Sequence, residues 1–168
     1  GYTELDRLLA GLQPGALVVI GARPGMGKTA FALGIAAHAA IREKLPVLFF
    51  SLEMGHMEIT QRLIAAEARV DSSKMRTGRL ADSDWSKITK AIGRLGEGTM
   101  WIDDNPAVSL MEIRSKARRL QDRVGQPLGL VVVDYLQLMQ GRGCAESRQV
   151  EVAEISRGLK VLAGELGA

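Results

Sequence analysis

The sequence predicts an α/β protein with a mainly parallel β-sheet that is flanked by helices. Short apolar runs without polar alternation are typical of parallel strands covered on both faces, and four such runs occur, at 16–20, 47–50, 100–102 and 128–133. Stretches with helical periodicity separate these runs. Strands that alternate with helices favour a parallel sheet with right-handed crossovers. A glycine-bearing loop joins the first apolar run to a helical stretch, which is the third feature of this fold class.

The remaining elements follow from periodicity and from start and stop signals. The spacing predicts helices over 4–10, 28–43, 57–69, 83–95, 109–124 and 149–166, with a shorter helix inside 70–82. Trp85, Ile88 and Ile92 should share one face of the fourth of these. Ser109 with Glu112 has the spacing of a capping box. Residues 140–147 read as a polar loop, and we expect the 168 residues to form a single domain without internal repeats.

Composition excludes several classes of protein. No apolar run approaches the ~18–20 residues that span a bilayer, so we expect no membrane segment. Cys144 is the only cysteine, which forbids an internal disulfide and fits a reducing cytoplasm. His38 and His56 lack neighbours at zinc-ligand spacing. The net charge of +3 does not by itself indicate nucleic-acid binding. The basic stretch from Arg114 to Arg123 is read as a solvated helix face.

The loop that follows the first apolar run has the residues of a phosphate-binding loop. Successive backbone N–H groups and the positive end of the helix dipole would face the anion. Lys28 would supply a point charge for the terminal phosphates, and the Thr29 hydroxyl would reach Mg²⁺. Ala22 stands where the strict pattern has glycine. We therefore expect a nucleoside triphosphate to bind at Ala22, Arg23, Pro24, Gly25, Met26, Gly27, Lys28 and Thr29.

Two carboxylates follow apolar runs at the predicted ligand-binding edge of the sheet. Asp134 directly follows 130–133 and could hold Mg²⁺ through its water shell, or it could cap a turn. Glu53 follows the run 47–50 and could orient the water that attacks the γ-phosphate. Its alternative role is to stabilise the dipole of the next helix near Met57. Asp103 and Asp104 end the third run, and we interpret them as turn formers.

Three motifs together closely resemble the RecA-type motor domain of bacterial replicative DnaB helicases. They are Gly-Ala-Arg-Pro-Gly-Met-Gly-Lys-Thr at 21–29, Phe-Ser-Leu-Glu-Met at 50–54 and Val-Val-Val-Asp-Tyr-Leu-Gln-Leu-Met at 131–139. Alanine at position 22 is usual in that family. The lead-in at 1–6 and the stretch 147–157 are similar to it too, so the resemblance covers essentially the whole chain.

The resemblance implies a RecA-like P-loop NTPase fold, with residues 1–168 as the N-terminal part of the ATPase domain and the C-terminal strands missing. It implies ATP and Mg²⁺ as ligands, Lys28 and Glu53 as catalytic residues, and Thr29 and Asp134 on the metal. Its implied partners are single-stranded DNA, which would contact Arg142 and Arg148, further copies of the chain in a hexamer, a primase and a helicase loader. The implied activity is 5′–3′ unwinding at the replication fork.

A sensor strand and an arginine finger of the family lie beyond the residues of this sequence. In the family that strand separates the strand of the phosphate loop from the strand that ends at Asp134. We therefore expect a gap at that place in the sheet. Two other functions stay open on the sequence: a RecA-family recombination or regulatory ATPase, and a noncatalytic module whose binding depends on nucleotide.

Overall fold

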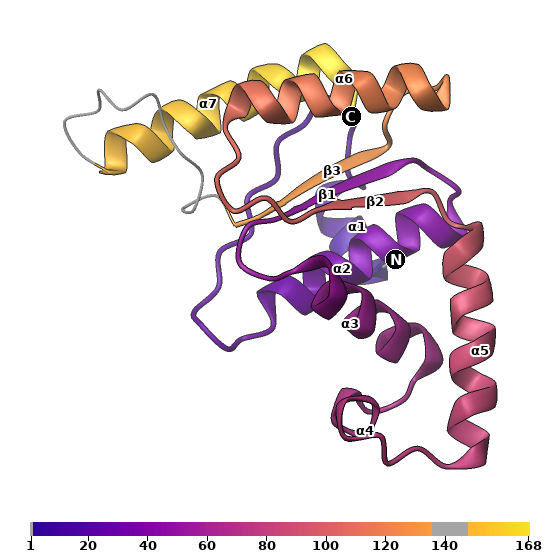
Figure 1. Ribbon diagram of the computed structural model, residues 1–168. Coiled ribbons are helices and arrows are strands. Elements are labelled where there is room, and N and C mark those ends of the chain that lie inside the picture. The colour runs from indigo at the N-terminus through magenta and orange to yellow at the C-terminus, as the bar shows by residue number, and fades with distance from the viewer. Residues whose placement is uncertain (1, 136–147) are drawn as a thin grey trace.

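The computed structural model describes residues 2–135 and 148–168. Figure 1 shows its elements arranged around a small parallel sheet. Among the described residues, no helix is long and apolar enough to cross a membrane. The described elements, in chain order, are α1 (Thr3–Leu9), α2 (Lys28–Ala37), the π-helix η1 (His38–Arg42), β1 (Val47–Ser51), α3 (His56–Ala68), α4 (Ser72–Thr77), α5 (Asp82–Glu97), β2 (Met100–Asp103), α6 (Leu110–Val124), β3 (Leu130–Asp134) and α7 (Arg148–Leu166).

The sheet has the order β2-β1-β3, and both pairings are parallel. Val47 is opposite Met100 on one side and Leu130 on the other, which fixes the register of the three strands. All five residues of β1 are buried because β1 has a strand on each side and helices over both faces. The parallel sheet flanked by helices that the apolar runs predicted is confirmed.

Successive side chains of β1 point to opposite faces, and each face has its own core. Val47 and Phe49 pack with residues of α2, η1 and α3, including the fully buried Ile59. Leu48 and Phe50 pack with residues of α6 and α7, including the fully buried Ile113. Figure 1 accordingly shows α6 and α7 above the sheet and α2 and α3 below it.

The buried face of α5 differs from the predicted one. Ile88 is buried, but Trp85 is 56% exposed and Ile92 is 52% exposed. The buried positions of α5 also include Ala91, which joins Ala68 of α3 in a small third core. Small residues at the crossing let the two helices approach closely, and this turns the bulkier Trp85 and Ile92 to the flank of the contact.

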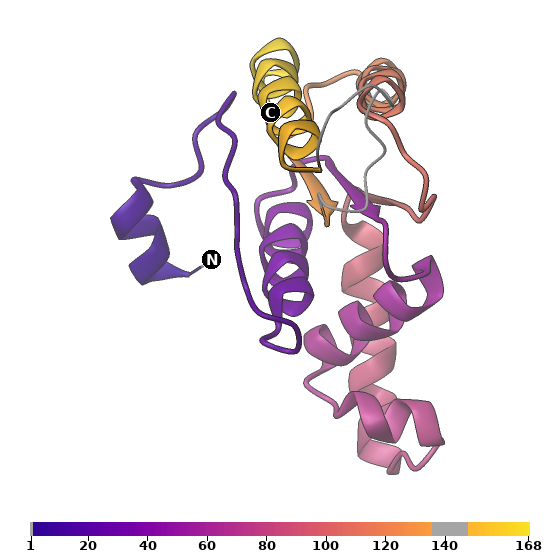
Figure 2. The same cartoon turned by 90° about the vertical axis from the view of Figure 1, so that its left-hand side faces the viewer.

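The predicted first strand over 16–20 is wrong for the described part of the chain. The backbone there is extended, but it pairs with no described strand, and Val18, Val19 and Ile20 are 40–69% exposed. Figure 2 shows this stretch running apart from β3. Its start is tied instead to the C-terminal residue and to α7, since Gly15 N–H donates to the carbonyl of Ala168 at 2.8 Å and Lys160 Nζ donates to the carbonyl of Gly15 at 2.7 Å. The expected gap in the sheet lies at this place.

The other predicted elements are present, with small differences in their bounds. The helix predicted over 28–43 is α2 continued by η1, and the short helix inside 70–82 is α4. The capping box of α6 is confirmed, because Ser109 Oγ accepts from Glu112 N–H at 3.3 Å and Glu112 Oε2 accepts from Ser109 N–H at 2.8 Å. The predicted loop 140–147, with Cys144, lies outside the described residues.

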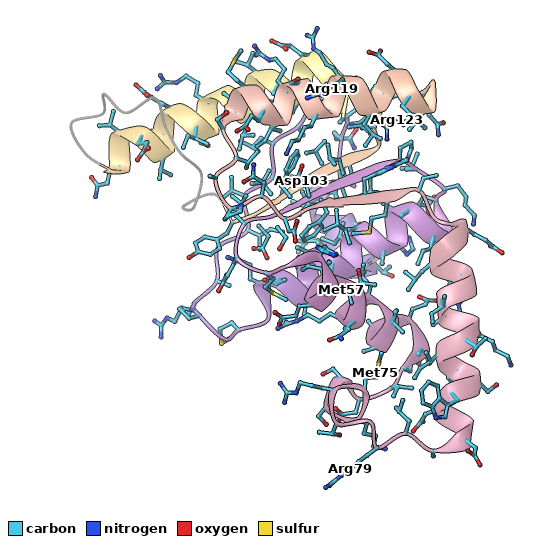
Figure 3. The ribbon with its side chains drawn as sticks, in the orientation of Figure 1. Met57, Met75, Arg79, Asp103, Arg119 and Arg123 are labelled. Carbon is cyan, nitrogen blue, oxygen red and sulfur yellow. The ribbon has the colours of Figure 1, made fainter. Side chains whose placement is uncertain are left out.

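The basic stretch on α6 is only partly a solvated face. Arg114 and Arg118 reach Glu165 of α7 at 3.1 and 3.3 Å, so they help to join the two helices on that side of the sheet. Arg119 and Arg123, which Figure 3 labels, are exposed as predicted.

Candidate nucleotide site

The predicted phosphate-binding loop runs into α2 without a side-chain cap. Gly25 and Gly27 have φ of 77° and 83°, a left-handed conformation that favours glycine. Gly27 is the N-cap of α2 and no side chain accepts from the first-turn N–H groups, which leaves them for another acceptor. Residues 22–27 are all exposed, and Lys28 and Thr29 are half-buried. Within the loop, Met26 N–H donates to the Arg23 carbonyl at 3.2 Å. The first-turn amides of α2 have no side-chain cap, as an anion site requires.

Asp134 of β3 is held by the two residues that begin α2. The Thr29 hydroxyl donates to Asp134 Oδ2 at 2.6 Å, and Lys28 Nζ lies 3.3 Å from Asp134 Oδ1. The Asp134 side chain is only 5% exposed, so both of its oxygens meet their charged or polar partner away from bulk water. Lys28 Nζ also lies 3.8 Å from the centre of the Tyr135 ring. Three of the predicted site residues therefore converge, although 105 positions separate Thr29 from Asp134.

Glu53 lies at the same edge of the sheet but does not touch this cluster. Ser51 is opposite Asp134 in the register, and Leu52 N–H donates to the Asp134 carbonyl at 2.8 Å. Glu53 is the next residue, and it is exposed. Within the described residues its carboxylate forms no hydrogen bond or ion pair, so it is free to meet a ligand above the strand ends.

Asp104 carries out the role that was the alternative for Glu53. Its Oδ2 accepts from the backbone N–H of His56, the first residue of α3, at 2.9 Å and lies 2.8 Å from His56 Nδ1. The hydrogen bond from the His56 N–H is the main reason that the pKa of Asp104 falls below its usual value. The sequence indicated only a turn former here; the pairing with a residue 48 positions away depends on the β1–β2 register. Asp104 thereby anchors the segment that carries Glu53.

Asp103 lies at the end of β2 and is a turn former, as predicted. Its Oδ1 accepts from Asn105 N–H at 3.1 Å, and its Oδ2 pairs with Lys116 of α6. These contacts engage both oxygens of the Asp103 carboxylate. Asp103 is therefore not a free acid at the site.

The oxygens at the site fit Mg²⁺ better than a metal that needs an all-protein cage. Thr29 and Asp134 bring one hydroxyl and one buried carboxylate together, and the described residues contain no cluster of three His, Cys, Asp or Glu side chains that could hold an ion. Mg²⁺ keeps several waters and is bound through one or two protein ligands together with substrate phosphates. The donor set therefore suits a magnesium–phosphate complex.

The two predicted DNA-contact residues cannot be compared with the described part of the structure. Arg142 lies outside the described residues. Arg148 begins α7, and its side chain lies outside the described part of the chain.

Comparison with known proteins shows the family to which the chain belongs. The family described as "DnaB-like helicase C terminal domain" matches residues 1–168. The chain belongs to this family. The replicative DNA helicase DnaB of Leifsonia xyli subsp. xyli is 51% identical over 166 residues, and that of Geobacillus stearothermophilus is 47% identical over 167. Each comparison covers 99% of this chain and 36% of the relative, so the chain spans about a third of their length.

Two solved structures share the fold of this chain. One is a DnaB-like replicative helicase, described with its interactions with primase, and the other is described as an ATPase domain. Both match with a TM-score of 0.92 at 37% identity over 100% of this chain, which is 40% of the first structure and 60% of the second. The predicted RecA-like α/β fold is confirmed.

Proposed function

We propose that residues 1–168 are the N-terminal part of the ATPase domain of a replicative DNA helicase, and that this site binds and hydrolyses ATP. The observation that carries the proposal is the contact of Lys28 and Thr29 with the buried Asp134, beside a loop whose amides have no cap. Membership of the DnaB-like family adds to it.

The geometry suggests how each residue would act on bound ATP. Amides of residues 22–29 would hold the phosphate chain, and Lys28 would leave Asp134 for the terminal phosphates, which are a stronger anionic partner. Thr29 and Asp134 would hold Mg²⁺. The ion, when bound, offsets the negative charge of the phosphate oxygens. The free carboxylate of Glu53 would orient the attacking water and accept its proton.

The activity of the whole protein would need partners. Arg142 and Arg148 would contact the phosphates of single-stranded DNA inside a homo-hexamer that unwinds the duplex in the 5′–3′ direction. A primase and a helicase loader would bind the same assembly, which would act in the cytoplasm. An arginine finger from the neighbouring subunit is worth about 10³–10⁵ in turnover. The 168-residue chain alone would therefore bind ATP and hydrolyse it poorly.

The test is Lys28→Ala in the full-length protein, measured as DNA-stimulated ATP hydrolysis. We expect turnover to be abolished. Lys44→Ala is the matched control, because Lys44 is an exposed lysine that pairs with Glu97 at 3.7 Å and should leave turnover unchanged. Normal hydrolysis by Lys28→Ala would contradict the assignment. ATP binding without any turnover in the unaltered protein would instead favour the noncatalytic module.

A further inference from the structure

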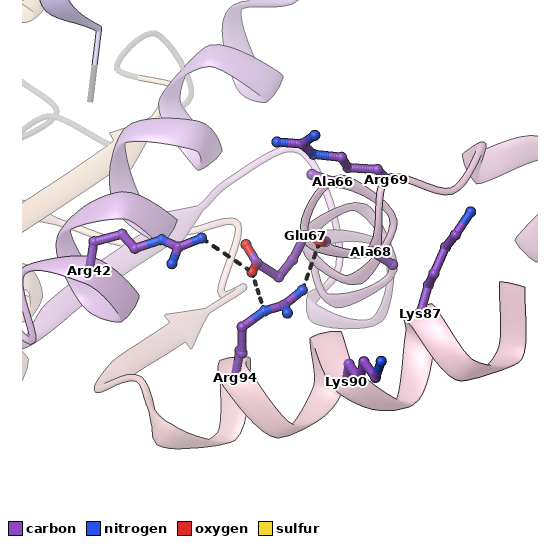
Figure 4. Close-up of a pocket in the computed structure, with 8 residues that line it drawn as sticks. All are labelled: Arg42, Ala66, Glu67, Ala68, Arg69, Lys87, Lys90 and Arg94. Atoms are coloured by element: carbon purple, nitrogen blue, oxygen red, sulfur yellow. Dashed lines mark hydrogen bonds and ion pairs between the residues drawn. The ribbon is translucent and has the colours of Figure 1, made fainter. Parts of the chain in front are cut away.

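A second hollow rich in cations lies away from the phosphate-binding loop. It has a volume of about 590 Å³ and lies where η1, the end of α3 and the middle of α5 meet (Figure 4). Arg42, at the end of η1, follows Lys28 by 14 residues along a continuous helical stretch. At 1.5 Å per residue this puts the two residues about 20 Å apart. The hollow therefore belongs to a different part of the molecule.

Positive charge exceeds negative charge in this hollow. Its ionisable lining is one carboxylate and five cations, namely Glu67, Arg42, Arg69, Lys87, Lys90 and Arg94. Glu67 is already matched, because Arg94 donates to its carboxylate and, at 3.1 Å, to its carbonyl, and Arg42 lies 3.8 Å from the same carboxylate. The carboxylate thus holds two guanidinium groups in place and leaves three cations for another partner.

Those three cations have little to neutralise them. Lys87 Nζ lies 3.9 Å from Asp84 Oδ1, a long contact on the same helix. Arg69 and Lys90 are exposed and form no ion pair with any residue that the structure describes. Three like charges around one hollow repel each other, and a multivalent anion would relieve that repulsion.

Backbone geometry brings the cations together from two sides. Lys87, Lys90 and Arg94 follow one another at i, i+3 and i+7, so they lie on one face of α5. Arg69 lies across from them as the C-cap of α3, with φ of 54° and its N–H bonded to the carbonyls at the end of that helix. Figure 4 shows that the five cations belong to three elements, η1, α3 and α5.

The uncharged residues that line the hollow favour a small anion over a nucleic acid or a protein segment. Besides the charged side chains only Ala66 and Ala68 contribute, so the hollow has no aromatic ring on which a base could stack and no large apolar anchor of the kind found at protein interfaces. Lysine ammonium groups bind phosphate as point charges, and a guanidinium adds directed donors. We propose that this hollow binds an oligophosphate, meaning a chain of two or three phosphates that is either inorganic or carried by a nucleotide.

The test is calorimetric titration of tripolyphosphate into the full-length protein carrying Lys28→Ala, which weakens binding at the first site. Within that background, Lys87→Gln with Lys90→Gln should weaken binding about a hundredfold, since each lysine would supply one hydrogen bond to a charged group and each such bond contributes about tenfold. The matched control is Arg119→Gln with Arg123→Gln, which removes two exposed cations from α6 on the other side of the sheet (Figure 3). It should change the affinity less than twofold.

Further variants and ligands in the same titration distinguish a nucleotide-borne phosphate chain from an inorganic one, and binding in this hollow from nonspecific binding to cations. Arg69→Gln should weaken tripolyphosphate binding in the same direction as the lysine pair, and equal thermal midpoints should show that all variants remain folded. If Lys87→Gln with Lys90→Gln weakens the binding of ATP as well as that of tripolyphosphate, the ligand is a phosphate chain carried by a nucleotide. If the double variant weakens the binding of tripolyphosphate alone, the ligand is an inorganic phosphate chain. Equal losses in the two double variants, or no loss in either, would overturn the proposal. So would tighter binding of oligothymidylate or polyglutamate than of tripolyphosphate through the same lysines.

Discussion

Replacement of Asp134 by asparagine separates the two roles of this carboxylate, because it removes the charge and keeps the shape. At 3.3 Å from Lys28 Nζ, the Coulomb energy of the pair is about 5 kcal/mol with an effective dielectric of about 20. Desolvation and the exposure of Lys28 offset most of it. The variant amide can still accept from Thr29, so a charge-assisted hydrogen bond becomes a neutral one, at a cost of about 1–2 kcal/mol. For a domain of this size we expect the midpoint of thermal unfolding to fall by about 3–6 °C.

The same variant should lose its response to magnesium. A ligand at 100 times its Kd stabilises the folded state by about 2.7 kcal/mol. ADP with Mg²⁺ should therefore raise the midpoint of the unaltered protein above the value with ADP and EDTA. In Asp134→Asn the two midpoints should coincide, because one of the two proposed protein ligands of the ion has lost its charge.

The assay is differential scanning calorimetry of the full-length protein with ADP, in Mg²⁺ or in EDTA. Asp122→Asn is the control, since Asp122 is an exposed carboxylate that forms no ion pair with the described residues. A full magnesium-dependent rise in Asp134→Asn would refute the metal site. An unchanged midpoint without ligand would refute the energy assigned to the Lys28 and Thr29 contacts.

Three further predictions concern packing and acid stability, and the same calorimetry checks them. Ile59→Ala should lower the free energy of unfolding by about 2–5 kcal/mol because Ile59 is fully buried. Ile92→Ala should lower it by under about 0.5 kcal/mol because Ile92 is 52% exposed. Similar losses in the two variants would mean that Ile92 is not on an exposed face of α5. Gly129→Ala should destabilise the fold by about 1–3 kcal/mol, since the added Cβ would lie 2.5 Å from Leu45 Cβ. The control is Gly164→Ala in α7, where the added Cβ meets nothing within 4 Å and should stabilise the fold by about 0.5–1 kcal/mol. The opposite order would contradict the close approach of Gly129 to Leu45. The pKa of Asp104 is lowered in the folded state, so its contribution to the free energy of unfolding is present above its unfolded pKa near 3.8 and is lost as pH falls through the folded value. Asp104→Asn should therefore lower the thermal midpoint at pH 7 and lessen the fall of that midpoint below about pH 4. The same fall in acid as in the unaltered protein would count against the hydrogen bond from Asp104 to the start of α3.

The glycine-bearing loop before α2 and the central strand could be predicted because their causes are local. Glycines with positive φ, a lysine and a hydroxyl at a helix start all lie within one short stretch of chain. β1 is buried on both faces and therefore reads as an uninterrupted apolar run. Asp134 could be predicted because it ends such a run. Its partners in space follow from the parallel topology.

The failures have non-local causes. The run 16–20 is as apolar as β1, but a strand also needs a neighbour to pair with, and no local pattern reports one. On α5 the helical period is correct, yet the buried face is the one with Ile88 and Ala91, which pack with Ala68 of α3, and not the one that also includes Trp85 and Ile92. The cap that Asp104 gives to α3 depends on strand register, which the sequence does not specify.

The unpaired extended stretch over 16–20 has a practical consequence for handling this chain by itself. Val18, Val19 and Ile20 combine high β-propensity, exposure and a backbone without ladder partners among the described residues. Such a segment is a template for intermolecular strand addition. Material expressed as these 168 residues alone should therefore self-associate as its concentration rises, and a charged residue at Val19, the most exposed of the three, should suppress that aggregation without disturbing either core.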